Sequence, residues 1–199
     1  DTLGDFAYAP DAEASFVFAA TFAQAARIWR GLGKKEQADQ WLAMAEKAYK
    51  WADANKPPMD TPAQLASRYL SPRAYAAAEL LHTTGDKKYN DDFLKSSVWA
   101  FQPDAPLDAS GLYDQQSAAW AYLQCPPELC DAAVRENIRK AIIAQADDFI
   151  IISSTLGYKT YRHPHAPISW GTGAYPHVIA PLLWSWKLTG DPKYMEWIV

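Results

Sequence analysis

The chain has 199 residues, of which 49% are hydrophobic and 21% are charged, and its formal net charge at pH 7 is −4. This size and apolar content suffice for one domain with a hydrophobic core. The acidic balance argues against a nucleic acid as partner, because nucleic acids select basic surfaces. No apolar run approaches the ~20 residues of a membrane span, and the N-terminus lacks the layout of a signal peptide. The chain does not begin with Met, which indicates a processed or excised product.

The first two helices are predicted directly after Pro10. In a helix over residues 12–29, apolar side chains would occupy nearly all faces, which predicts that this helix is buried on most of its sides. A glycine-containing turn at 31–33 ends this helix. The next helix, Lys35–Ala54, carries a single apolar stripe with charged residues on its other side, so one of its faces is expected to contact solvent.

The same pair of helices recurs along the chain. Further pairs are predicted over 71–101, 116–149 and 175–199, each with a short turn between its two helices. The turns after Leu81 and after Trp186 share the sequence Thr-Gly-Asp-x-Lys-Tyr, 105 residues apart. Such recurrence is typical of a repeat architecture, in which each unit buries its apolar face against its neighbours.

Alternation of all-round apolar helices with one-sided helices predicts two concentric layers, an inner ring and an outer ring. The expected fold class is therefore all-α, an α/α toroid built of helical hairpins. Four pairs are fewer than such a ring usually has, so the chain is expected to form an incomplete (α/α)6 barrel. Residues 1–199 are accordingly predicted to be a single helical domain that is part of a larger one.

The connections from an outer helix to the next inner helix gather at one end of a toroid. These connections are long and rich in proline, and long loops with aromatic content are more often functional than connective. They are Lys56–Tyr69, Gln102–Gln115 and Ser153–Ala174. Their rings either stack on sugar faces or cap the hydrophobic ends of the barrel. The rings are those of Tyr69, Tyr113, Tyr161 and Trp170.

The stretch 158–175 is the densest in aromatic and polar residues and is predicted to form part of a binding surface. Its candidate ligand-binding residues are Tyr161, Arg162, His163, His165, Trp170 and Tyr175. The His-x-His spacing of His163 and His165 can hold a metal ion when the backbone is extended. No third ligand lies nearby in sequence, so hydrogen bonding to a polar ligand and plain loop structure are the alternatives. We expect no metal and no cofactor.

Several aspartates are candidate functional carboxylates. Asp104, Asp108 and Asp114 could lie at a cleft, although Asp is also favoured in turns and at helix caps. Asp147 and Asp148 fall within a helical pattern and are predicted to be solvated. The sequence has no Ser-His-Asp signature, no phosphate-cradling glycine loop and no nucleotide fingerprint.

Cys125 and Cys130 flank a Pro-Pro turn. That arrangement is compatible with a disulfide that closes a small loop and equally with two free thiols. The spacing of Cys and His residues does not correspond to a structural zinc site.

Glu13–Trp29, followed by Ala45–Ala48, resembles the central helices of glycoside hydrolase family nine, the cellulase family with an (α/α)6 barrel. The stretches Ala76–Asp86 and Trp170–Tyr194 fit the same template in the same order. The resemblance spans essentially the whole chain.

The resemblance implies an inverting mechanism, in which an Asp base and a Glu acid stand far enough apart to admit a water molecule. Neither catalytic motif is present in this chain. The family's Asp-Ala-Gly-Asp segment would precede Asp1, and the acid would follow Val199. By this resemblance the chain supplies the scaffold of the substrate cleft, contains no catalytic residue and is inactive alone.

Trp170 matches the Trp of the family's Trp-Gly segment, whose ring lines the sugar cleft. Ala174 departs from the arginine of several endoglucanases of the family, which leaves an exo-acting or amino-sugar-directed member open. The expected partners are a β-1,4-linked glucan or a related oligosaccharide and the remainder of the same catalytic domain, in a secreted or periplasmic protein. The alternatives are a non-catalytic α/α repeat domain that binds glycan or protein, and another toroid enzyme such as an epimerase or lyase.

Overall fold

The computed structural model describes residues 10–109, 113–155 and 176–198, and in these residues the chain is almost entirely helical. The helices are α1 (Ala12–Gly31), α2 (Lys35–Ala54), α3 (Pro62–Leu65), α4 (Ser71–Thr84), α5 (Lys88–Leu94), α6 (Val98–Phe101), α7 (Gln116–Gln124), α8 (Ala132–Thr155), α9 (Pro176–Thr189) and α10 (Lys193–Glu196). A π-helical turn spans Ala66–Leu70 and a 3-10 turn spans Pro127–Leu129. The short strands β1 (Asp108–Ala109) and β2 (Tyr113–Asp114) pair antiparallel. The all-α class predicted from the sequence is confirmed.

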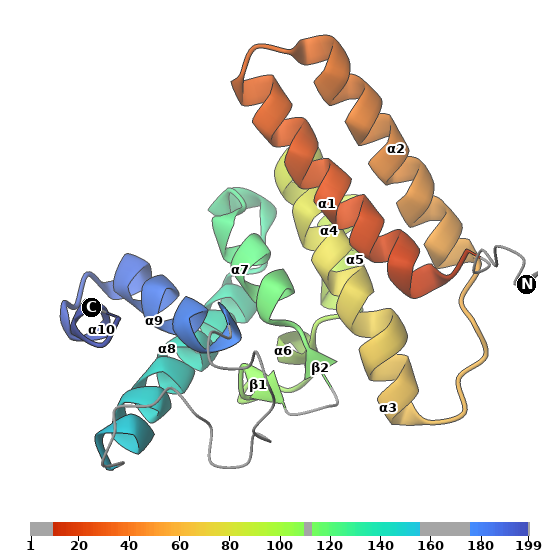
Figure 1. Cartoon of the computed structure of the whole chain (residues 1–199). Coiled ribbons are helices and arrows are strands. Elements are labelled where there is room, and N and C mark those ends of the chain that lie inside the picture. The colour runs from red at the N-terminus through yellow and green to blue at the C-terminus, as the bar shows by residue number, and fades with distance from the viewer. Residues whose placement is uncertain (1–9, 110–112, 156–175, 199) are drawn as a thin grey trace, which may run out of the picture.

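The helices form consecutive antiparallel pairs that stand side by side (Figure 1). Helix α4 packs against α1 on one side and against α7 on the other. Each of these three helices also packs against the second helix of its own pair, which is α2, α5 or α8. Between α7 and α9, the rings of Trp120 and Trp184 stack with centroids 5.1 Å apart. Eleven of the fourteen residues of α4 are buried, against four of the twenty residues of α2. The contrast between α4 and α2 agrees with the predicted difference between inner and outer helices.

The two Thr-Gly-Asp turns have the same hydrogen bonds. In both, the threonine hydroxyl accepts from the aspartate N–H at 3.1 Å, and the aspartate carboxylate accepts from the lysine N–H at 3.0 or 2.9 Å. Gly85 and Gly190 have φ values of 71° and 72°, in the left-handed region that glycine adopts without steric cost. The repeat read from the sequence is thus a repeat of backbone geometry.

The tyrosine that follows each of these turns anchors it to the preceding outer helix. Tyr89 donates its hydroxyl to Glu46 Oε1 of α2 at 3.4 Å, and Tyr194 donates to Asp147 Oδ1 of α8 at 3.0 Å. Lys193 Nζ also lies 2.8 Å from Asp147 Oδ1. Asp147 thus links two helix pairs while its side chain stays 39% exposed. The predicted solvation holds for Asp147 and for the exposed Asp148, but the helical pattern alone did not show that Asp147 meets the next repeat.

Two boundaries also differ from the sequence prediction. The segment after Lys88 is not one helix, because Ser97 takes an extended conformation (φ −79°, ψ 127°) between α5 and α6. The connection predicted over 56–69 contains α3 and the π-helical turn, which run directly into α4. Helical structure therefore begins at Pro62, before the predicted start at residue 71. Thr61 is the N-cap, and its Oγ1 accepts a hydrogen bond from the N–H of Gln64 at 3.2 Å.

Helix α1 is less enclosed than its apolar sequence predicts. One side packs against α2 and α4, and its alanines there are fully buried. On another side, Val17 and Ile28 are 45% and 59% exposed, since no other described helix makes extensive contact there. No described helix is both long enough and apolar enough to cross a membrane.

Candidate functional site

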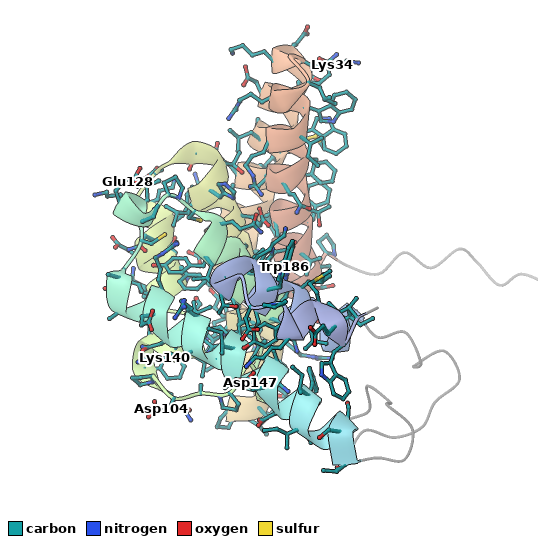
Figure 2. All side chains as sticks on the ribbon, turned by 90° about the vertical axis from the view of Figure 1, so that its left-hand side faces the viewer. Lys34, Asp104, Glu128, Lys140, Asp147 and Trp186 are labelled. Carbon is teal, nitrogen blue, oxygen red and sulfur yellow. The ribbon has the colours of Figure 1, made fainter. Side chains whose placement is uncertain are left out.

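The long connections and the short turns lie at opposite ends of the helix pairs. In Figure 1 the α1–α2 turn is at the top, whereas α3, the β1–β2 hairpin and the last turns of α8 lie lower. In Figure 2, Lys34 and Glu128 mark two short turns in the upper part, and Asp104 marks a long connection near the bottom. The end with the long connections is the candidate functional end, as the order of the helices predicts.

The π-helical turn Ala66–Leu70 forms part of this end and contacts β2. Tyr69, within it, meets the ring of Phe16 edge-on with centroids 5.5 Å apart. The Tyr69 hydroxyl donates to Asp53 Oδ1 at 3.2 Å, and burial together with this carboxylate raises its pKa. Of the two roles left open for this ring, the buried position supports packing at the barrel end rather than stacking on a ligand.

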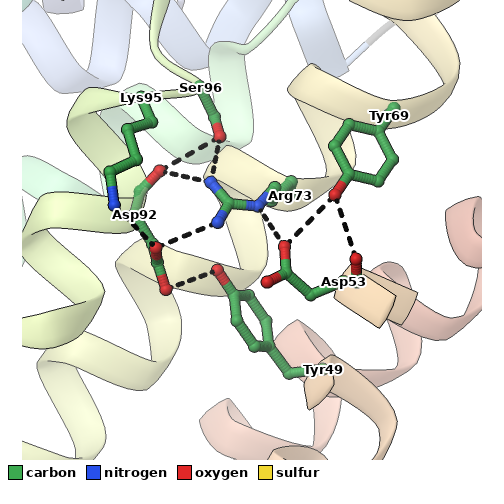
Figure 3. A network of polar contacts seen from close by, with 7 residues as sticks. All are labelled: Tyr49, Asp53, Tyr69, Arg73, Asp92, Lys95 and Ser96. Carbon is green, nitrogen blue, oxygen red and sulfur yellow. Dashed lines mark hydrogen bonds and ion pairs between the residues drawn. The ribbon is translucent and has the colours of Figure 1, made fainter. Parts of the chain in front are cut away.

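Beside Tyr69, the guanidinium of Arg73 is the centre of a buried polar network (Figure 3). Arg73 Nε donates to Asp53 Oδ1 of α2 at 2.7 Å, and Nη2 donates to Asp92 Oδ1 of α5 at 2.9 Å. Its Nη1 donates to Ser96 Oγ at 2.7 Å and to the carbonyl oxygen of Asp92 at 2.8 Å. Tyr49 donates to Asp92 Oδ2 at 3.2 Å, and burial raises the pKa of its hydroxyl.

This network fixes the start of α4 against the outer helices α2 and α5. Both carboxylate oxygens of Asp92 and the Oδ1 of Asp53 accept hydrogen bonds from Arg73 or from tyrosine hydroxyls. A carboxylate held in this way is a poor acid or base for a bound ligand. We therefore assign the Arg73 network to the scaffold of the functional end and not to its chemistry.

Some buried polar atoms near this end have no hydrogen-bond partner. Within the described ranges these include Ser71 Oγ at the start of α4, Gln116 Oε1 at the start of α7 and Ser97 Oγ just before α6. Neighbouring Gln115, by contrast, is fully engaged, accepting from the N–H of Val98 at 3.0 Å and donating to the carbonyl of Ser96 at 2.9 Å. Buried polar atoms are usually paired, so the starts of α4 and α7 retain unused hydrogen-bonding capacity.

Two hollows of similar size open on the described surface. One, of ≈ 660 Å³, lies at the start of α1 and is lined by Asp11, Glu13 and Arg68 among others. Arg68 Nε stands 4.0 Å from Glu13 Oε2. The other, of ≈ 640 Å³, lies between α2 and α5 beside the Arg73 network. Only the first of the two is at the start of an inner helix, where the long connections also lie.

Most of the residues predicted to bind a ligand fall outside the described residues. They are Tyr161, Arg162, His163, His165, Trp170 and Tyr175. Tyr113 is placed by its backbone alone, in β2 opposite Ala109, and Asp108 pairs with Asp114 across the same hairpin. This hairpin stands at the functional end, as predicted for the connection 102–115. The roles of these side chains stay predictions.

Sequence reasoning missed the arginines that organise the interior. Arg27 of α1 forms an ion pair with Glu79 of α4 and donates to Thr83 Oγ1 at 2.7 Å. A signal was present, because Arg73 and Glu79 occupy positions inside an alanine-rich, buried helix where an isolated charge is costly. Charges at such positions predict buried ion pairs, although the sequence does not identify the partners.

No three His, Cys, Asp or Glu side chains gather closely enough to hold a metal ion within residues 10–109, 113–155 and 176–198.

The sequence matches the model of one known protein family. The model of glycosyl hydrolase family 9 matches residues 6–196. That match covers nearly the whole chain, including the helix pairs and the long connections. Among curated proteins, none matches the sequence.

Solved structures of this family have the same fold. The family 9 endoglucanase J30 superposes with a TM-score of 0.76 at 22% identity, covering 94% of this chain and 35% of that one. A metagenome-derived family 9 endoglucanase gives 0.70 at 24% identity, with coverage of 92% and 34%. The family 9 protein of Bacteroides ovatus gives 0.69 at 20% identity, with coverage of 92% and 37%. The chain thus spans about a third of the length of these proteins.

Proposed function

Because the chain belongs to glycosyl hydrolase family 9, we propose that it is part of an inverting glycoside hydrolase that cleaves β-1,4-linked glucan or a related oligosaccharide. The family match over residues 6–196 carries this proposal. The endoglucanases among the similar structures support a glucan as substrate. A polymeric glycan is met outside the cytoplasm, so the proposed location is secreted or periplasmic.

The catalytic carboxylates are proposed to lie in the remainder of the protein. Inversion needs two carboxyl groups with room for water between them. The most buried acid described, Glu79, is paired with Arg27, and Asp92 is held by Arg73. Neither acid is free to exchange a proton with a substrate, which supports the proposal that this chain supplies scaffold and no catalytic pair.

Substrate binding is proposed for the connection between α8 and α9 and for the β1–β2 hairpin. Trp170 has the leading role, with its ring stacked on a sugar face. The other residues proposed to contact the glycan are Tyr113, Tyr161, Arg162, His163, His165 and Tyr175.

The remainder of the same catalytic domain is proposed to complete the (α/α)6 barrel around this chain. The exposed apolar side chains of α1 and α2 support this proposal, since soluble proteins seldom leave large contiguous apolar patches uncovered. Val17, Ile28 and Met44 are among them. Residues 1–199 then form one helical part of a larger domain.

A non-catalytic α/α repeat domain that binds glycan or protein is the second candidate, favoured by the paired state of the buried acids. A toroid epimerase or lyase is a third and weaker one, since it would share the architecture but not the resemblance around Trp170.

The binding proposal is tested with the complete enzyme and soluble cello-oligosaccharides. Replacing Trp170 by Ala is expected to lower kcat/KM by about two- to tenfold, because a stacked aromatic ring contributes roughly 0.5–1.5 kcal/mol. Trp186, exposed near the C-terminal end of α9, provides the matched control. Equal kcat/KM values for Trp170→Ala and Trp186→Ala would remove Trp170 from the binding site.

A further inference from the structure

Both cysteines of the chain lie in the turn between α7 and α8. Cys125 follows the last residue of α7, and the 3-10 turn Pro127–Leu129 folds Cys130 back over the end of that helix. The Cys130 sulfur lies 3.8 Å from the carbonyl oxygen of Tyr122, and the Cys125 sulfur lies 3.4 Å from that of Ala121. The two thiols therefore stand over neighbouring carbonyl groups of one helical turn.

Arg135 of α8 holds this turn closed. Its Nη1 donates to the carbonyl oxygen of Cys125 at 3.1 Å and lies 3.7 Å from the sulfur of Cys130. The same nitrogen donates to the carbonyl of Tyr122 at 2.9 Å, and Nη2 donates to that of Leu123 at 2.9 Å. One guanidinium thus places positive charge beside the Cys130 sulfur and fixes the backbone that carries Cys125.

The two thiols differ in reactivity as a result. A hydrogen bond from Cys125 and the nearby Arg135 lower the pKa of Cys130 to about 7. The same contact and burial raise the pKa of Cys125, whose side chain is 2% exposed. Since the thiolate is the nucleophile, Cys130 is the thiol that reacts first with an external oxidant. Cys125 is then the neighbouring thiol that completes the reaction.

We propose that Cys125 and Cys130 are a modification site that a low-molecular-weight disulfide, such as oxidised glutathione, converts to an intramolecular disulfide. The Cys130 thiolate attacks one sulfur of the reagent, and one glutathione thiolate leaves. Cys125 then gives its proton to water, and its sulfur attacks that of Cys130 and releases the second glutathione. Two protein thiols are oxidised and one disulfide is reduced to two thiols, with transfer of two electrons.

The bridge closes a six-residue loop at the end of the barrel opposite the long connections. It removes freedom from the unfolded chain and fixes the turn between α7 and α8. We therefore expect it to stabilise the fold and to leave glycan hydrolysis unchanged. This inference does not depend on the proposed function, because neither cysteine belongs to the functional end.

Peptide mapping tests the bridge directly. The protein is purified with reductant, exposed to oxidised glutathione at about pH 8, where a low-pKa thiol is mostly ionised, and then alkylated with iodoacetamide in denaturant. Trypsin places both cysteines in one peptide, Ser96–Arg135. We expect this peptide to be unalkylated and lighter by two hydrogens. A second cut after Glu128, between the cysteines, should leave halves that separate only after reduction. Alkylation of both cysteines would overturn the proposal.

Single variants test the order of the two steps. Cys125→Ser is expected to retain one glutathione on Cys130, because no second thiol can release it. Cys130→Ser is expected to react slowly if at all, because Cys125 is buried. The reverse pattern, with glutathione retained on Cys125, would contradict the assignment of Cys130 as the first nucleophile.

Thermal unfolding measures the consequence of the bridge. Reduction should lower the Tm of the oxidised wild-type protein by about 4 °C or more and leave that of Cys125→Ser unchanged. An unchanged Tm in a wild-type protein shown to be bridged would overturn the stabilising role. If the variant does not fold, the mapping of the wild-type peptide still decides whether the bridge forms.

Discussion

Arg27 and Arg73 are both arginines of inner helices, but they join different parts of the molecule. Arg27 joins α1 to α4 within the inner layer, through the carboxylate of Glu79 and the hydroxyl of Thr83. Arg73 joins α4 to α2 and α5 across the two layers, through the carboxylates of Asp53 and Asp92. One arginine therefore sets the spacing within a ring, and the other sets the spacing between rings.

Burial also differs between the two arginines. The side chain of Arg73 is 9% exposed, less than both of its carboxylate partners, whereas that of Arg27 is 23% exposed and its partner Glu79 is 4% exposed. In the outer network the arginine bears most of the desolvation cost, and in the inner pair the acid bears it. This difference predicts that the stability contributed by the Arg73 network depends mainly on the charge of Arg73. The stability contributed by the Arg27–Glu79 pair should depend mainly on the protonation state of Glu79.

The largest expected effect is that of Arg73→Met. Removal of the guanidinium leaves Asp53, Asp92 and Ser96 without their shared donor, and we expect a loss of about 3–5 kcal/mol in the free energy of unfolding. Urea unfolding measures it. Arg73→Lys, which keeps the charge but cannot reach all of these acceptors, should lose less. A loss below about 1 kcal/mol for Arg73→Met would show that the network does not hold the two layers together.

Arg27→Met is expected to cost less, about 1–3 kcal/mol. Glu79 loses its partner but can take up a proton, which removes the uncompensated charge. The double variant Arg27→Met with Glu79→Gln should recover part of the loss, and a double-mutant cycle from urea unfolding gives the coupling between the two residues. If Arg27→Met costs more than Arg73→Met, the proposed difference between the two arginines is reversed.

The pH dependence of stability gives a smaller but more specific effect. Burial raises the pKa of Glu79 above its ordinary value of 4.5, against the opposing influence of Arg27. The native acid therefore keeps its proton where the unfolded chain has lost it. This contribution to stability is complete below about pH 4.5 and is lost as pH rises through the raised pKa. The unfolding free energy of the wild type, relative to Glu79→Gln, should fall over that range, and a flat difference would contradict the account.

The smallest predicted effects concern the two Thr-Gly-Asp turns, which lie outside both arginine networks. Gly85→Ala and Gly190→Ala should each lose about 1–2 kcal/mol, because both positions have φ in the left-handed region. Their Tm values test whether the two turns are equivalent in energy as well as in geometry. Gly31→Ala, inside α1 with open space around it, is the control and should be neutral or stabilising.

The helix pairs could be predicted because their apolar patterns extend over whole helices. The bounds of α2 were predicted without error, and the second helix of the pair predicted over 116–149 buries Ile138 and Ile142. The π-helical turn at Ala66–Leu70 and the break at Ser97 were not predicted. The break at Ser97 lies beside Ser96, which accepts a hydrogen bond from Arg73, and such a tertiary contact leaves no periodic signal in the sequence.

The candidate site could be placed at one end of the fold but not built in detail. Alternation of long and short connections predicted which end carries the long segments, and the structure confirms that arrangement. The ring of Tyr69 is an example, since composition alone does not distinguish a packing ring from a ligand-binding ring. Its contact with Phe16 and its hydrogen bond to Asp53 settle that question for this residue alone.

The most direct measurement of the central claim compares the isolated 199-residue chain with the complete enzyme on soluble β-1,4-glucan. We expect the complete enzyme to release sugars whose first-formed anomer is inverted, as followed by proton NMR, and the isolated chain to release none. Hydrolysis by the isolated chain would contradict the claim that it provides scaffold and substrate contacts but no catalytic pair.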